Sequence, residues 1–170
     1  MFCKTQFCVL LQRKNETTMK LAEALSIRKD LQKRIDQISE RINNNVKVQE
    51  GDQPNENPKE LFAELDACLR QLQDIIYKIN LTNIHTQVEG VTLTQLMAER
   101  DVLSLRLTKM RAIFNNASAT QDRYSRSEIK MVVTVDVKKL TKEIDLLSAK
   151  YRQLDIKIQA ANFATELLES

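Results

Sequence analysis

The sequence almost lacks the residues that interrupt helices. Its 170 residues include two glycines, two prolines and no tryptophan. Scarce glycine and proline favour long helices over a strand-rich fold. With only Gly51 and Gly90, the chain cannot form the glycine-rich loop that cradles nucleotide phosphates. Its length suits one domain with a sizeable core.

Strong charge of one sign and long apolar runs are lacking as well. The formal net charge is +3, which gives no strong electrostatic argument for a nucleic-acid or anionic-lipid partner. No run reaches the roughly 18 apolar residues that a membrane-spanning helix needs. Of three cysteines, only Cys68 lies beyond residue 18, so the folded part cannot form an internal disulfide. We therefore expect a reducing, cytoplasmic location.

Residues 1–18 differ from the rest of the chain. They show no helical periodicity, and their apolar patch at 7–11 is shorter than the roughly 7–15 residues of a secretory signal core. The periodic pattern begins at Met19. We predict that 1–18 is a non-native or disordered extension, that Met19 is the natural start, and that 19–170 forms a single helical domain.

Four stretches repeat apolar residues at steps of three and four, which puts one apolar stripe on each of four helices. We expect these helices over about 19–47, 57–79, 92–114 and 137–161. One helix cannot bury its stripe alone. The prediction is therefore an all-α fold of four long amphipathic helices in a bundle or coiled-coil arrangement. The stripe of the last helix consists of Val137, Leu140, Ile144, Leu147, Tyr151, Leu154, Ile158 and Ala161.

Three of the expected helices carry recognisable start signals. Asn57 precedes Pro58, which suits the first helical position. Thr92 and Gln95 have the spacing of a capping box. Asp136 stands where it can cap the last helix. These residues fix the starts better than the apolar pattern does.

Two segments alternate apolar and polar residues, which predicts a small strand pair. They are 84–88 and 129–135, and the segment 115–127 between helix and strand reads as a loop. A lone strand leaves its backbone groups unpaired, so each is the best partner for the other within the chain. Pairing with another subunit remains open.

Arg100 interrupts the stripe of its helix where an apolar residue belongs. An unpaired buried guanidinium is very costly, so Arg100 needs a carboxylate or solvent. Asp101 is one position away, and such neighbours do not face each other on a helix. The expected partners are Glu128, Asp136 or Glu64. Arg100 either forms such a pair, reaches solvent, or belongs to an anion-binding site.

The segment 123–130 places two arginines among hydroxyl groups, which suits a phosphate or carboxylate. The alternative is a solvated loop in which Glu128 pairs locally. Together with Arg100, the segment forms a candidate anion-binding site or buried polar cluster. Its residues are Arg100, Asp101, Arg123, Tyr124, Arg126, Glu128 and Lys130.

Recognisable catalytic and cofactor chemistry is missing from the sequence. His85 is the single histidine, and no His, Cys or carboxylate lies at metal-ligand spacing from it. Cys68 occupies a core position of its helix, where a free cysteine is usually a small buried apolar residue. We predict no catalytic residue, metal site or cofactor, and no enzyme activity.

A series of short motifs gives the chain a family resemblance. The motifs are 19–25, 80–83, Gly90 with Thr92 and Leu93, 100–101, 123–130, 135–137, 154–155, Gln159 and Asn162. By their length and order, the chain from Met19 onward resembles the septicolysin-like family of uncharacterised bacterial cytoplasmic helical proteins. The resemblance implies a cytoplasmic helical protein, and the family label suggests a cytolysin. Phe163 departs from the Trp that relatives carry there.

Three functions follow from these observations. The first is a self-associating structural or interaction protein, since Leu146, Ile156 and Ala160 lie off the main stripe and suggest a second contact face. The second is a small-anion or nucleotide binder that uses Arg100, Arg123 and Arg126. The third, from the resemblance, is a septicolysin-type pore-forming toxin. We expect a homo-oligomer, no nucleic-acid partner and no membrane span.

Overall fold

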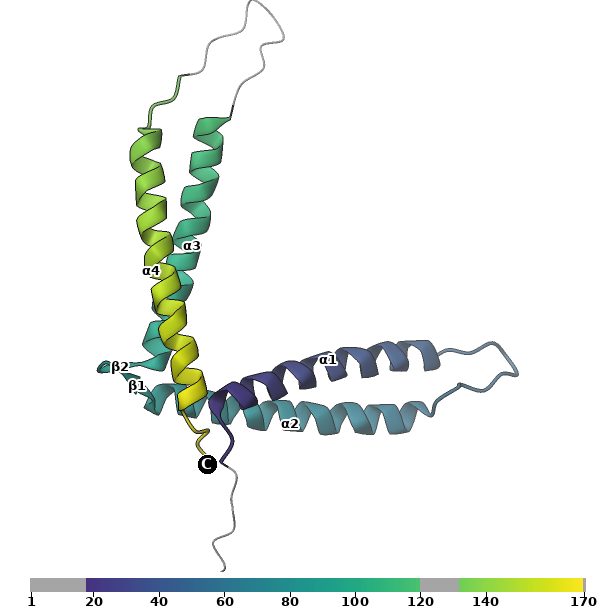
Figure 1. The fold of residues 1–170 in the computed structure, drawn as a ribbon. Coiled ribbons are helices and arrows are strands. Elements are labelled where there is room, and N and C mark those ends of the chain that lie inside the picture. Colours follow the sequence, from purple (N-terminus) through teal and green to yellow (C-terminus); the bar gives the residue numbers. More distant parts are fainter. Residues whose placement is uncertain (1–17, 120–131, 170) are drawn as a thin grey trace, which may run out of the picture. The chain divides into compact units, whose positions relative to one another are not determined.

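The computed structural model describes residues 18–119 and 132–169, and within them the protein is an all-α fold with one very small sheet (Figure 1). This confirms the predicted fold class. The elements are α1 (Leu21–Asn45), α2 (Pro58–His85), β1 (Gln87–Val88), β2 (Val91–Thr92), α3 (Leu93–Ser118) and α4 (Val137–Ala164). The predicted extension 1–18 lies outside the described residues except for Thr18.

The chain divides into two compact units. One consists of Met1–Ile79 with Thr165–Ser170, and the other of Asn80–Ala164. The first unit holds α1 and α2 up to Ile79, which we call the first hairpin. The second unit holds α3 and α4, which we call the second hairpin.

The first hairpin is held by a core of aliphatic side chains from both helices. Ile38 and Ile42 of α1 pack in one buried cluster with Leu61 and Cys68 of α2. Removing these apolar surfaces from water is the main stabilising term for such a pair. Cys68 is buried, as its core position predicts.

The C-terminal tail is part of the first unit. Leu21 donates its backbone N–H to the Thr165 carbonyl at 3.0 Å, and Leu167 donates to the Met19 carbonyl at 2.8 Å. The Leu167 side chain is buried. The two bonds satisfy backbone groups that would otherwise stay open at the start of α1.

The second hairpin consists of antiparallel helices joined by buried leucines and isoleucine. Glu99 near the start of α3 pairs with Lys150, and Arg106 further along pairs with the earlier Glu143, which fixes the antiparallel direction. The buried apolar side chains are Leu93, Leu96, Leu103, Leu107, Leu154, Ile158 and Ala161.

All three predicted helix starts are confirmed. Asn57 Oδ1 accepts the backbone N–H of Lys59 at 3.1 Å. Thr92 and Gln95 form the reciprocal capping box at the start of α3. Asp136 Oδ1 accepts the N–H of Lys139 at 3.0 Å. These bonds satisfy donors that a helix cannot satisfy internally.

The predicted strand pair is wrong in its partner. Val88 pairs with Val91 across an antiparallel hairpin, so β1 pairs with β2 and not with the described residues 132–135. Glu89 and Gly90 both have positive φ, 54° and 82°, which suits a two-residue hairpin loop. Local closure of this kind costs less chain entropy than pairing across a long loop. Residues 132–135 form no strand, and 129–131 lie outside the described residues.

Two predicted helix ends are also wrong. The helix expected to break at Asn80 continues to His85, and the helix expected to stop near 114 continues to Ser118. Thr82 and Asn83 interrupt the apolar pattern, yet both are buried within α2. Polar side chains therefore ended the apolar stripe without ending the helix.

Candidate functional site

Arg100 on α3 has two carboxylate partners in the second hairpin. Its Nη2 lies 2.9 Å from Asp101 Oδ1, and its Nε donates to the same oxygen at 3.1 Å. Its Nη1 lies 3.9 Å from Asp155 Oδ1 on α4. The guanidinium is partly buried, with 26% of the side chain exposed.

These partners differ from the predicted Asp136 and Glu64, while the third predicted partner, Glu128, lies outside the described residues. The sequence argument excluded Asp101 because neighbouring residues point in different directions on a helix, and it favoured Glu128, Asp136 or Glu64. The long arginine side chain instead bends back along the helix surface and reaches the adjacent carboxylate. Two carboxylates already compensate the Arg100 charge, which supports the ion-pair interpretation over an anion site at this residue.

The remaining members of the predicted cluster lie outside the described residues. They are Arg123, Tyr124, Arg126, Glu128 and Lys130. The structure therefore brings Arg100 and Asp101 together, and the anion site at 123–130 stays a prediction.

Ion pairs follow one edge of the second hairpin. Lys150 Nζ lies 2.7 Å from Glu99 Oε1, and Lys157 Nζ lies 2.7 Å from Glu89 Oε2. Arg106 pairs with Glu143 at the same distance. Exposed pairs of this kind contribute little stability, but they leave this edge nearly neutral.

The other side of the second hairpin contains a small groove of about 240 Å³ that sequence reasoning missed. We call it the arginine groove. Arg111 Nη2 donates to Ser148 Oγ across it at 3.2 Å. No sequence motif predicts the groove, because its residues come from two helices, and only the folded structure shows which residues of α3 lie beside which residues of α4. It is lined by Ser104, Leu107, Thr108, Arg111, Ser148, Tyr151 and Arg152.

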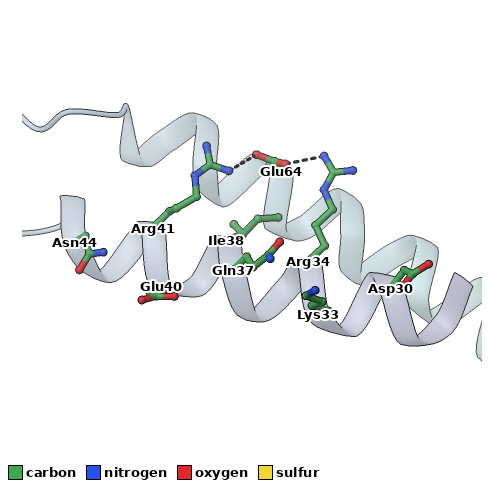
Figure 2. Close-up of a pocket in the computed structure, with 9 residues that line it drawn as sticks. All are labelled: Asp30, Lys33, Arg34, Gln37, Ile38, Glu40, Arg41, Asn44 and Glu64. Carbon is green, nitrogen blue, oxygen red and sulfur yellow. Dashed lines mark hydrogen bonds and ion pairs between the residues drawn. The ribbon is translucent and has the colours of Figure 1, made fainter. Parts of the chain in front are cut away.

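A second polar cluster, which we call the arginine clamp, joins the helices of the first hairpin (Figure 2). Glu64 of α2 lies between two arginines of α1, 2.7 Å from Arg34 Nη2 and 3.4 Å from Arg41 Nη1. Arg41 also donates to both carboxylate oxygens of Glu56. Buried Asn45 accepts the N–H of Glu56 and donates to the Arg41 carbonyl. The clamp borders a depression of about 700 Å³ along α1.

The clamp shifts the acidity of its carboxyls. The hydrogen bond from Arg34 is the main cause that lowers the pKa of Glu64, and the hydrogen bond from Arg41 does the same to the pKa of Glu56. The i, i+7 spacing of Arg34 and Arg41 could have indicated a shared helix face. It could not have indicated Glu64. The two arginines and two glutamates of the clamp compensate one another's charges. We therefore interpret the clamp as a contact that holds α1 against α2.

Metal and membrane features are missing from the described residues. Over 18–119 and 132–169, no group of three or more His, Cys, Asp or Glu side chains could hold a metal ion. Within these same two segments, none of the helices has a stretch apolar enough to cross a lipid bilayer.

Comparisons with known proteins place the chain in a family. A search of curated proteins gives no match. The chain is 42% identical to a functionally unknown conserved protein from Corynebacterium diphtheriae with a crystal structure, covering 89% of this chain and 99% of that one, with a TM-score of 0.83. Neither this structure nor the family match supports the septicolysin-like designation. Residues 28–167 match the model of a family of unknown function, and the chain belongs to that family, DUF6847.

Proposed function

We propose that this chain is a self-associating structural or interaction protein whose copies pair through the outward face of α4. The observation that carries the proposal is a second apolar stripe on that helix. We call it the outer stripe. It consists of Leu146, Ala149, Ile156, Ala160 and Phe163, with one uncharged polar residue, Gln153, near its centre.

The outer stripe has the periodicity of a helix–helix contact. Its members follow one another at steps of three, four, three, four and three, which aligns them along one face. Each member lies two positions beyond the residue that faces α3, as Ile156 does from Leu154. Two positions rotate by about 200°, so the outer stripe faces away from α3. Leu146, Ile156 and Phe163 are 72%, 68% and 71% exposed.

The order of side-chain sizes favours a second copy as the occupant. Alanine is the second residue from either end of the outer stripe, and the other four positions carry larger side chains. An antiparallel copy would therefore set Leu146 against Phe163 and Ala149 against Ala160. A two-fold dimer needs such a self-complementary surface. Facing alanines also let two helices approach closely.

The charges beside the outer stripe are compatible with this pairing. Lys150 and Lys157 flank it, and like charges from two copies would repel. Each lysine, however, is already paired with a glutamate of its own chain, Glu99 and Glu89. The pairing therefore compensates the two cations on this side of the stripe, while Arg152 on its other side forms no ion pair with a described residue.

We also propose that the protein is not an enzyme and that it lies in the cytoplasm. The Cys68 thiol is packed in the core of the first hairpin, which makes it unsuitable as an exposed nucleophile. A reduced buried thiol suits a reducing compartment.

A matched pair of substitutions tests the proposal. Ile156 on α4 and Val102 on α3 are both 68% exposed apolar residues of the second hairpin. Ile156→Glu puts two carboxylates near the two-fold axis, so we expect sedimentation velocity to show at least a tenfold weaker dimer. Val102→Glu adds the same charge to the other helix and leaves the dimer intact. A dimer that survives Ile156→Glu, or one that only Val102→Glu dissociates, contradicts pairing through α4.

A further inference from the structure

Two arginines of the second hairpin differ from the other two in their partners. Arg100 and Arg106 are ion-paired with carboxylates. Arg111 and Arg152 have no carboxylate within ion-pair distance in the segments that the structure describes. A guanidinium without a carboxylate partner is well suited to bind an anion.

Both unpaired guanidiniums line the arginine groove, and no acidic side chain lines it with them. The nearest carboxylates along α4 are Asp145, three positions before Ser148, and Asp155, three positions beyond Arg152. Neither forms an ion pair with a groove arginine, and Asp155 lies beside Arg100. The groove therefore holds two positive charges that no direct ion pair compensates among the described residues. The sides of the groove come from two packed helices, which fix the backbone positions that carry the two arginines.

Hydroxyl groups complete the lining. Ser148 Oγ accepts the bond from Arg111, which leaves its own O–H as a donor. Tyr151 and Ser104 add two further hydroxyls. Thr108 donates its hydroxyl to the Ser104 carbonyl within α3, so it contributes an oxygen rather than a donor.

We propose that the arginine groove binds a phosphate group. A phosphate offers several acceptor oxygens to the guanidiniums and hydroxyls at once, and charge-assisted bonds of this kind are the strong ones. The groove volume of about 240 Å³ is below the roughly 300–1,000 Å³ typical of drug-sized ligands, so it suits one phosphate rather than a large organic molecule. Arg152 lies four positions before Ile156, so the groove borders the outer stripe, but its phosphate chemistry does not depend on self-association.

Isothermal titration calorimetry of the full chain tests the proposal. Inorganic phosphate and O-phosphoserine are titrated at constant ionic strength, with acetate as the comparison anion. We expect saturable phosphate binding and none with acetate. Tighter O-phosphoserine binding assigns the site to phosphate esters, and tighter inorganic phosphate binding assigns it to the free ion. Heat that does not saturate with either phosphate overturns the proposal.

A matched arginine serves as the control. Arg111→Gln removes one charge from the groove and should weaken phosphate binding about tenfold, the usual effect of losing one charge-assisted bond. Arg106→Gln removes the same charge from the same helix but on the ion-paired edge, and should change binding less than twofold. If both variants lose the same phosphate affinity, the net charge of the protein attracts the phosphate, and the proposed site is wrong. Circular dichroism confirms that each variant is folded.

Discussion

The two helical hairpins place their exposed apolar residues differently. In α2, Phe62 and Leu69 directly follow core residues and are 49% and 44% exposed, so they widen a single apolar face. In the second hairpin, Leu105 and Ile156 lie two positions beyond the core residues Leu103 and Leu154 and are 58% and 68% exposed. Tyr77 is the exception in α2, since it too lies two positions beyond a core residue and is exposed.

The first hairpin therefore has one main apolar face, which is buried, whereas the second hairpin has a buried apolar face and an exposed one. A helix that is apolar on opposite sides needs a partner on each side or leaves one side in water. The first hairpin instead uses polar side chains at its surface to tie its helices together, through the arginine clamp. The following changes test this contrast.

The largest effect is expected in the core of the first hairpin. Ile38 is 1% exposed, so Ile38→Ala should cost about 2–5 kcal/mol of unfolding free energy, because it removes buried methyl groups and leaves a cavity. Leu105→Ala on the exposed side of α3 should cost no more than about 0.5 kcal/mol. Urea denaturation measures both. If both substitutions cost the same unfolding free energy, Leu105 is buried in solution, and the two hairpins do not differ in their exposed apolar residues.

A smaller effect is expected where the second hairpin begins. Thr92→Ala removes the side chain that accepts the Gln95 N–H, so it should cost about 1 kcal/mol. Thr92→Ser keeps the hydroxyl and should restore most of the stability. Thermal unfolding compares the three proteins. If serine is no better than alanine, the capping bond is not what stabilises α3.

The smallest effect concerns the arginine clamp and depends on pH. The pKa of Glu64 is lowered in the folded protein, so this carboxylate stabilises the fold above its unfolded value of about 4.5 and loses that contribution as pH falls through its folded-state pKa. Glu64→Gln should therefore lower the melting temperature slightly at pH 7. The difference from wild type should shrink at acid pH. A difference that stays constant from pH 7 to acid pH contradicts the charge-based account of the clamp.

The helices and their starts could be predicted because local chemistry determines them. Asn57, Thr92 and Asp136 cap helices through residues within three positions, and the apolar steps of three and four identify the inner faces. The end of α2 could not be predicted, because Thr82 and Asn83 look like loop residues until their burial is known. Exposed Leu146, Ile156 and Ala160 were correctly placed off the main stripe.

The polar clusters were harder to predict, because they depend on contacts between distant residues. Arg34 and Arg41 meet Glu64 only through the register of α1 against α2. Arg111 and Ser148 meet only through the register of α3 against α4. Arg100 was difficult to predict for another reason. Helix geometry alone excluded a contact with the adjacent Asp101, but the long arginine side chain reaches this carboxylate.

The central claim is that the outward face of α4 pairs two copies of the chain. Sedimentation equilibrium of the full wild-type chain, followed from low micromolar to several hundred micromolar, tests it most directly. The account predicts a monomer–dimer equilibrium that reaches twice the chain mass and goes no further, because a two-fold contact closes on itself. A single-chain mass at every concentration, or a mass that keeps growing, would contradict it.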